Sequence, residues 1–157
     1  MPRLILALLL FAPFLAACDT GEDDPITTVS ITGVSLLEIP FTDANGEPWD
    51  DGDNPDVYLR FLINGVSVAN TREDAEAIGP SDLGSSLELD NDVVRDDLNA
   101  TLAIEVRDRD SGPQGEDPII GVTQALSLQT IADEERAARI LTSTDGDTRL
   151  NVTFEYD

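Results

Sequence analysis

Residues 57–68 read VYLRFLINGVSV, and this stretch decides the fold. Residues 57–63 are β-branched, aromatic and aliphatic side chains in a largely alternating order, which is typical of a β-strand. Asn64-Gly65 is a dipeptide favoured in tight turns between antiparallel strands, because both residues tolerate a positive φ. Residues 66–68 then return as a second strand. The stretch therefore predicts a β-hairpin within an antiparallel sheet.

Further segments of this kind follow one another along the chain. Together with the hairpin they give eight expected strands, at residues 29–36, 57–63, 66–68, 85–89, 101–106, 119–128, 140–143 and 150–156. Only residues 72–78 and 131–139 have a helical pattern, and both segments are short. Many short strands with turn-rich connections predict an all-β fold, an eight-stranded antiparallel β-sandwich that occupies residues 27–157 as one domain.

The composition excludes several kinds of site. The chain of 157 residues has 9 basic and 32 acidic side chains, a net charge of −23 and no histidine. Every basic residue is an arginine, so histidine bases, histidine metal ligands and Schiff-base lysines are all excluded. Clustered positive charge for nucleic-acid phosphates is also lacking, and we expect no nucleic-acid partner. No glutamate stands in the apolar setting that a general acid needs, and we expect that the protein is not an enzyme.

The N-terminal region has the pattern of a bacterial signal peptide. Residues 4–17 form a continuous apolar run that is shorter than the roughly 20 residues of a membrane-spanning helix. The run ends in LAAC at residues 15–18, which resembles the lipobox of bacterial lipoproteins, where the cysteine receives lipid and becomes the mature N-terminus. The resemblance implies a signal peptide at residues 1–17, a lipidated Cys18 and an acidic tether at residues 18–26.

These features predict an extracytoplasmic protein that is attached to a bacterial membrane through the lipid on Cys18. The acidic residues after the cysteine resemble the surface-export signal of some bacterial lipoproteins, which favours the outer membrane or the cell surface. Aspartate directly after the cysteine, here Asp19, marks inner-membrane retention in other bacteria, so both membranes stay open. A plain secretory signal followed by a chance cysteine is the competing interpretation.

Two long polar loops carry the acidic side chains of interest. Residues 39–56 and 107–118 are rich in Asp, Gly and Pro, and long loops in a compact sandwich usually have a function. Asp108 and Asp110 lie two apart, so their carboxylates leave the same face of an extended backbone. Asp117 reaches the same ion if the intervening loop doubles back. Since calcium takes six to eight oxygen ligands, several of them carboxylates, the loops predict a calcium site.

The order of these motifs resembles the C2 domain, the calcium-binding β-sandwich of synaptotagmins and protein kinase C. Residues 56–61 (DVYLRF) match the aspartate-led strand of that family. Residues 106–110 (VRDRD) match the end of a later strand, and residues 117–121 (DPIIG) match the piece that follows it. The resemblance covers nearly all of residues 29–156. It implies a C2-like sandwich, and the first and last strands suit the circularly permuted variant of that fold.

The resemblance also implies a set of calcium ligands. The implied ligands of more than one Ca²⁺ ion are Asp50, Asp56, Asp108, Asp110 and Asp117. Asp43 competes with Asp50 for the first position, because the loop is longer than in the family, and Glu116 competes with Asp117 for the last. Trp49, beside the first ligand, is either a core residue or a docking group at the loop tip, and we expect the core role.

Two functions fit these observations. The first is a lipid-anchored calcium-binding module of the cell envelope that interacts with a protein, a glycan or a phospholipid membrane through its calcium loops. Phospholipid docking is the least expected of these, because the acidic chain lacks a basic groove that attracts anionic lipids. The alternative is a calcium-independent structural surface lipoprotein, whose acidic surface resembles that of proteins from salt-adapted bacteria.

Overall fold

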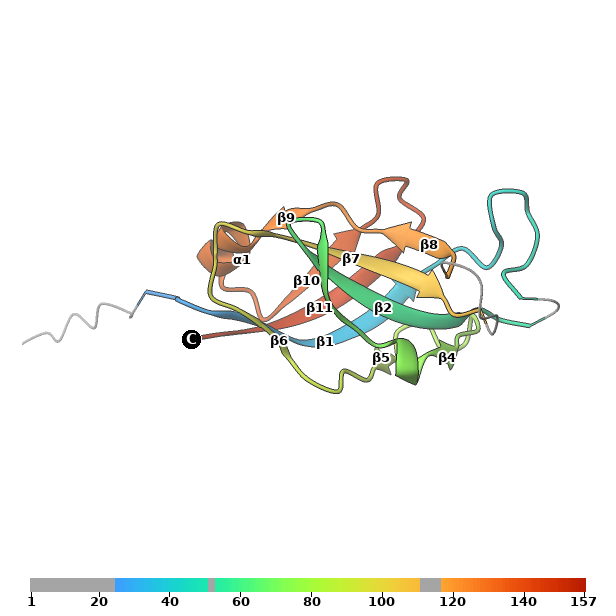
Figure 1. Cartoon of the computed structure of the whole chain (residues 1–157), viewed down its shortest axis with the longest axis horizontal. Helices are drawn as coiled ribbons and strands as arrows, with labels where there is room; N and C mark the ends of the chain where they lie inside the picture. The colour runs from blue at the N-terminus through green and yellow to red at the C-terminus, as the bar shows by residue number, and fades with distance from the viewer. Residues whose placement is uncertain (1–24, 51–52, 111–116) are drawn as a thin grey trace, which may run out of the picture.

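The computed structural model describes residues 25–50, 53–110 and 117–157. Two antiparallel sheets pack face to face as a β-sandwich, with the short helix α1 (Leu128–Glu134) near one end (Figure 1). The predicted all-β sandwich is thereby confirmed. The expected signal peptide, Cys18 and Glu116 lie outside the described residues. Within the described ranges, no helix is both long and apolar enough to cross a membrane.

The first sheet contains the first and last strands of the chain. Its members are β1 (Val29–Glu38), β5 (Ser86–Leu87), β6 (Val93–Arg95), β10 (Ala138–Thr142) and β11 (Arg149–Tyr156). Their order is β10-β11-β1-β5, and β6 also pairs with β1. β1 and β11 are antiparallel neighbours from Val29↔Tyr156 to Glu38↔Arg149. The two ends of the domain therefore lie side by side, while the circularly permuted strand order stays a prediction.

The second sheet is built around the predicted hairpin. Its members are β2 (Asp56–Ile63), β3 (Val66–Asn70), β4 (Glu76–Ala77), β7 (Thr101–Asp108), β8 (Ile119–Val122) and β9 (Leu126–Ser127). Their order is β3-β2-β7-β8, with β4 beside β2 and β9 beside β7. Asn64 and Gly65 take positive φ angles of 51° and 77° in the turn between β2 and β3. The hairpin prediction is confirmed.

The core lies between the two sheets. Leu59 and Phe61 of β2 and Leu102 and Ile104 of β7 are at most 1% exposed, and they belong to one apolar cluster with Leu150 of β11. Burying a side chain of this size contributes about 1.5–3 kcal/mol. The alternation of β2 and β7 therefore fixes which of their side chains point into the sandwich and which point outward.

The described residues form eleven strands, because one expected segment is divided in two and the short strands β4 and β6 were not expected. The run at residues 119–128 is two strands, β8 and β9, and the break comes at Thr123. The hydroxyl of Thr123 accepts the backbone N–H of Ile104, while the N–H of Thr123 donates to the carbonyl of Ile104, each at 2.9 Å. A side chain thus replaces a backbone partner in the ladder. The N–H of Gln124 then donates to the carbonyl of Thr142 in the other sheet at 2.9 Å.

Both expected helices are shorter than predicted. Residues 72–78 contain only one 3₁₀ turn, η1 (Arg72–Asp74), and then β4, which pairs with the start of β2. The helix expected at residues 131–139 is α1, which starts earlier and ends at Glu134, because Glu135 adopts a left-handed conformation with φ 47°. The prediction missed β4 and β6, since strands of two or three residues are too short to show a period.

Gly121 of β8 lies in close contact with Thr148. A Cβ atom at position 121 would lie 2.7 Å from the Cβ of Thr148, and closer still to its hydroxyl oxygen. Thr148 is 0% exposed, so it does not move aside without disturbing its neighbours. Only glycine fits at position 121.

We expect Gly121→Ala to lower the free energy of unfolding by about 1–3 kcal/mol, the usual cost of overpacking. Gly33→Ala is the matched control, because a Cβ at position 33 meets Thr153 at 3.6 Å, an ordinary van der Waals contact. Urea unfolding of the two variants measures the difference between them. Equal midpoints would contradict the steric role of Gly121.

Candidate metal centre

Three of the predicted ligands meet where β2 begins and β7 ends. The two strands are antiparallel neighbours, and Val57 pairs with Asp108 at the end of their ladder. Residues 39–50 of the loop before β2 extend from this same end of the sandwich (Figure 1). Asp50, Asp108 and Asp110 each offer one carboxylate oxygen, and these oxygens lie within 4.8 Å of one another. We call these three residues the carboxylate cluster.

The loop that carries Asp50 is folded back on itself. Thr42 and Pro48 form an isolated antiparallel bridge within it. The indole N–H of Trp49 donates to the carbonyl of Pro40 at 2.8 Å, and the partly buried ring packs against the core. The expected core role of Trp49 is confirmed. Its ring fixes the base of the loop, and Asp50 is the next residue.

Asp108 is the buried member of the carboxylate cluster. It is 0% exposed, and its Oδ1 accepts the backbone N–H of Asp56 at 2.8 Å. Its Oδ2 is also buried and has no hydrogen-bond partner in the part of the chain that the structure describes. Burial, together with the nearby charge of Asp50, raises the pKa of Asp108 from 3.8 to about 6. A carboxylate in this setting favours a proton or a cation.

The other cluster members add negative charge around Asp108. Partial burial raises the pKa of Asp50, and the charges of Asp56 and Asp110 raise it further. Asp110 is exposed. Repulsion within the cluster therefore works against the folded loops unless positive charge is supplied.

Asp56 lies next to the cluster, but its carboxylate already has a cationic partner. The Nη2 of Arg109 donates to Oδ2 of Asp56 at 3.3 Å, and both side chains are about one-third exposed. The charge of Asp56 nevertheless reaches the cluster, since it contributes to the raised pKa values of Asp50 and Asp108.

Asp117 is held by a separate network on the outer face of β2 and β7. Its carboxylate accepts the hydroxyl of Tyr58 at 2.8 Å and the Nη2 of Arg72 at 3.0 Å. These bonds, led by the one from Arg72, lower the pKa of Asp117 to about 2. The structure therefore does not place Asp117 among the three clustered carboxylates.

Asp43 organises the tip of its own loop. Its Oδ1 accepts the backbone N–H groups of Asn45 and Glu47 at 2.8 and 2.9 Å, and these hydrogen bonds lower its pKa. The structure brings Asp50 into the cluster and leaves Asp43, which is partly exposed, outside it. The sequence Asp43-Ala44-Asn45-Gly46 carries a signal for this role, because aspartate commonly accepts a backbone N–H two residues later in a turn.

Arg72 and Arg109 were not among the predicted site residues. Arg109 stands between two predicted ligands, and its position there was a visible signal. Arg72 gave no local signal, because it lies 45 residues before Asp117 in the chain.

The cluster is suited to a hard cation. Calcium prefers carboxylate oxygens and accepts irregular geometry, whereas magnesium requires a near-octahedral set at short distances. Here the oxygens come from a loop, a strand end and the residues after it, and one of them is buried without a hydrogen-bond donor. Asp50, Asp108 and Asp110 therefore fit a calcium ion that would complete its coordination with water or other oxygens.

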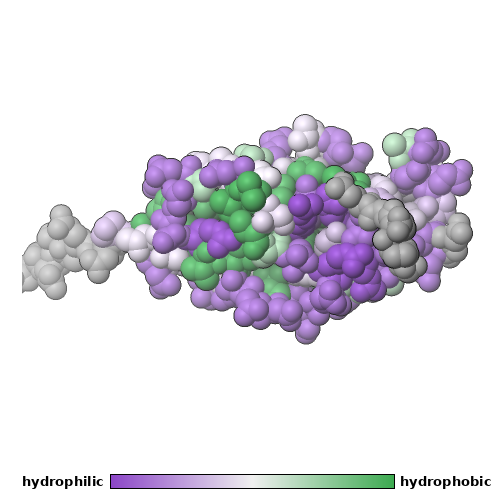
Figure 2. Space-filling model, in the orientation of Figure 1, coloured by the Kyte–Doolittle hydropathy of each residue, from purple (hydrophilic) through white to green (hydrophobic). Residues whose placement is uncertain are grey.

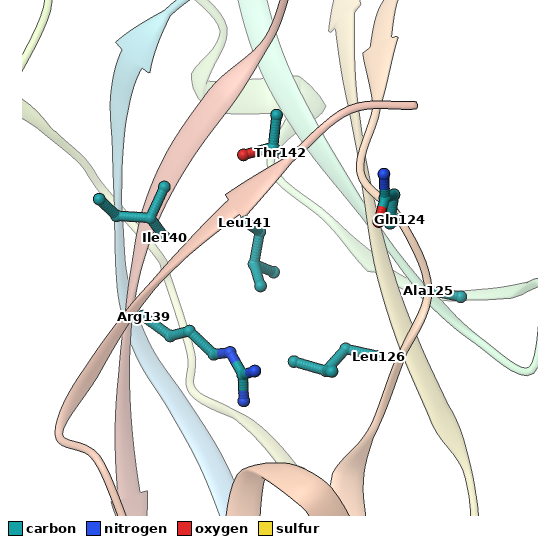
Figure 3. Close-up of a pocket in the computed structure, with 7 residues that line it drawn as sticks. All are labelled: Gln124, Ala125, Leu126, Arg139, Ile140, Leu141 and Thr142. Carbon is teal, nitrogen blue, oxygen red and sulfur yellow. The ribbon is translucent and has the colours of Figure 1, made fainter. Parts of the chain in front are cut away.

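A hollow of about 210 Å³ lies elsewhere, between β10 and residues 124–126 (Figure 3). Leu126 and Leu141 point into it, and the guanidinium of Arg139 extends into the same space. Arg139 pairs with Oε2 of Glu134 at 3.1 Å. The residues that line this hollow offer no carboxylate, and it is not a metal site.

No protein-family model matches the chain, and no curated protein matches its sequence. Solved structures do align with it. A C2 domain aligns over 83% of this chain and 97% of its own, at 11% identity and a TM-score of 0.48. A C2 domain protein from Ramazzottius varieornatus aligns over 82% of this chain and 89% of its own, at 13% identity and a TM-score of 0.44. A C2 domain of plant Extended Synaptotagmin 1 aligns over 85% of this chain and 95% of its own, at 16% identity and a TM-score of 0.50. This last likeness shows that the chain has a C2-like β-sandwich fold.

Proposed function

We propose that the chain is a non-enzymatic, calcium-binding C2-like module. The observation that carries the proposal is the buried carboxylate of Asp108, one oxygen of which has no hydrogen-bond partner among the described residues. A buried charge without a counter-charge is costly, and a bound cation removes that cost. Asp50 and Asp110 provide the additional oxygens at the distance that one ion requires.

Calcium bound here stabilises the end of the sandwich where β2 begins and β7 ends, which we call the loop end. The ion supplies positive charge. Asp108 holds it at the end of β7, and Asp50 connects the loop before β2 to it. Extracytoplasmic calcium modules bind with dissociation constants of about 10⁻⁴–10⁻³ M, and we expect a value in that range. Calcium would then act as a constant structural ligand in a calcium-rich exterior.

The proposed cellular setting rests on the sequence of residues 1–26. A signal peptide at residues 1–17 and lipid on Cys18 would place the module on a bacterial membrane, facing away from the cytoplasm. Its partner at the calcium loops would be a protein, a glycan or a membrane. A net charge of −23 opposes docking on anionic lipids, which favours the first two.

A calcium-independent structural lipoprotein is the second candidate. It is favoured by the ion pairs of Asp56 with Arg109 and of Asp117 with Arg72, which connect the loop end without a metal. Hydrophilic residues also cover much of the loop end of the face seen in Figure 2, and a highly charged, hydrated surface produces such a pattern without any specific ion. The two candidates differ in their response to calcium.

We expect millimolar calcium to raise the thermal unfolding temperature of the purified protein by several degrees. Calcium at 10 mM, about 10–100 times the expected dissociation constant, adds about 1.4–2.7 kcal/mol to the stability, and about 1 kcal/mol shifts the midpoint by about 2–4 °C in a chain of this size. Asp108→Asn and Asp110→Asn should each abolish most of the rise. Scans in chelator and in calcium give the shift directly.

Two control variants separate a site from general charge screening. Glu155→Gln removes an exposed acid near the C-terminus, which lies at the opposite end of the molecule (Figure 1), and should keep the full calcium response. Asp43→Asn should also keep it, because Asp43 lies outside the cluster. An equal rise with calcium, magnesium and sodium chloride of matched ionic strength would favour the calcium-independent lipoprotein.

The raised pKa of Asp108 predicts a pH dependence of stability in calcium-free buffer. Between about pH 6 and pH 4 the folded protein binds a proton at Asp108 that the unfolded chain does not bind. The ionised group therefore destabilises the fold above about pH 6, and this effect disappears as the pH falls toward 4. Asp117, whose pKa is lowered, acts in the opposite direction and only below about pH 4.

Asp108→Asn should consequently be more stable than the wild type at about pH 7 without calcium, because it removes the buried charge and its amide can donate to Asp50. The advantage should shrink at about pH 5, where the wild type carries the proton. Urea unfolding at both pH values measures it. A difference between the two proteins that does not change with pH would show that Asp108 titrates normally.

A further inference from the structure

Two arginines are paired with Asp56 and Asp117, the implied ligands that lie outside the carboxylate cluster. Arg109 comes from the segment that carries Asp108 and Asp110, and its Nη2 lies 3.3 Å from Oδ2 of Asp56. Its backbone N–H also donates to the carbonyl of Asp56 at 2.8 Å. Arg109 is therefore held against the start of β2 by both its side chain and its backbone.

Arg72 holds Asp117 more completely. Its Nε and Nη2 donate to the two oxygens of Asp117 at 2.5 and 3.0 Å, a two-pronged arrangement that is among the strongest ion pairs in proteins. The hydroxyl of Tyr58 donates to the same carboxylate, and the Nη1 of Arg107 donates to the backbone carbonyl of Asp117 at 2.8 Å. Asp117 is only 8% exposed, and both of its carboxylate oxygens have donors.

The contrast with Asp108 decides how many ions the loop end holds. Asp117 is a buried acid whose hydrogen bonds are complete, whereas Asp108 is a buried acid with one oxygen left unpaired in the described ranges. A metal ion at Asp117 would have to displace a guanidinium that contacts both carboxylate oxygens, and a metal ion at Asp56 would compete with the guanidinium of Arg109 at Oδ2. A metal ion among Asp50, Asp108 and Asp110 displaces nothing that the structure describes.

We propose that Arg72 and Arg109 act as built-in cations at Asp117 and Asp56, so that the loop end holds a single calcium ion at Asp50, Asp108 and Asp110. This inference rests on the proposed calcium-binding function. It differs from the expectation, drawn from the resemblance, of more than one ion. The arginines provide permanent positive charge at Asp56 and Asp117, and calcium provides the positive charge at the carboxylate cluster.

The charge of Arg109 also sets the affinity of the single site. It lies beside Asp56, whose own charge acts on both Asp50 and Asp108. A guanidinium at that position repels a divalent ion and removes Asp56 from the set of free carboxylates. Weak binding is the expected consequence, and removal of the guanidinium should strengthen it.

Calcium titrations of the purified protein test the inference, with calorimetry and equilibrium dialysis as the two measurements of binding. The wild type should bind one calcium ion per chain. Arg109→Gln should bind calcium about tenfold more tightly, the effect of removing one positive charge close to a divalent ion. Arg72→Gln combined with Arg109→Gln should bind more than one ion. Arg136→Gln, which breaks an exposed pair with Glu134 at 3.5 Å and changes the net charge equally, should match the wild type.

Each result is decisive. Two or more ions on the wild type would overturn the inference and leave the proposed function standing, and so would an Arg109→Gln affinity equal to that of Arg136→Gln. If the double variant fails to fold, Arg109→Gln alone decides, because the Arg109 side chain is one-third exposed and its contacts with Asp56 and with the carbonyl of Arg72 are long, at 3.3 and 3.5 Å. Failure of the wild type and of Arg109→Gln to bind calcium at all would instead overturn the proposed function, and the inference with it.

Discussion

The loop end of this protein depends on the pairing of β2 with β7. Their ladder runs from Ile63↔Leu102 to Val57↔Asp108, and side chains alternate between core and outer face along it. Asp108 therefore continues the inward-facing row of Leu102, Ile104 and Val106, and its carboxylate is buried at the end of the core. A slip of one residue would expose the apolar row, so the register that completes the core also creates the buried charge.

The two faces of this ladder end in different electrostatic environments. On the outer face Tyr58 pairs with Arg107, and both donate hydrogen bonds to Asp117, which also has Arg72. On the inner face Asp108 meets Asp50 and Asp110, and its Oδ2 has no hydrogen-bond partner among the described residues. This end of the strand pair thus presents an acid that is already paired with an arginine and an acid that has no such partner among the described residues.

Short-range patterns allowed much of the fold to be predicted. Asn64-Gly65 predicted the hairpin turn because its φ requirement is local, and the alternation of residues 57–63 predicted a strand. The break at Thr123 was not predictable, because it depends on a hydroxyl that bonds to Ile104 in another strand. In the site, spacing from Asp56 favoured Asp50 over Asp43, and the structure brings Asp50 into the cluster.

The sequence by itself determined the all-β class, the central hairpin, the exclusion of histidine and lysine chemistry, and a set of candidate acids. Each of these follows from composition or from residues that are close in the chain. Only the tertiary structure decided which acid meets which partner. Asp108 receives its N–H donor from 52 residues away, and Asp117 receives Arg72 from 45 residues away. Charge pairing depends on distance in space, which the folded sheets set and a linear pattern does not contain.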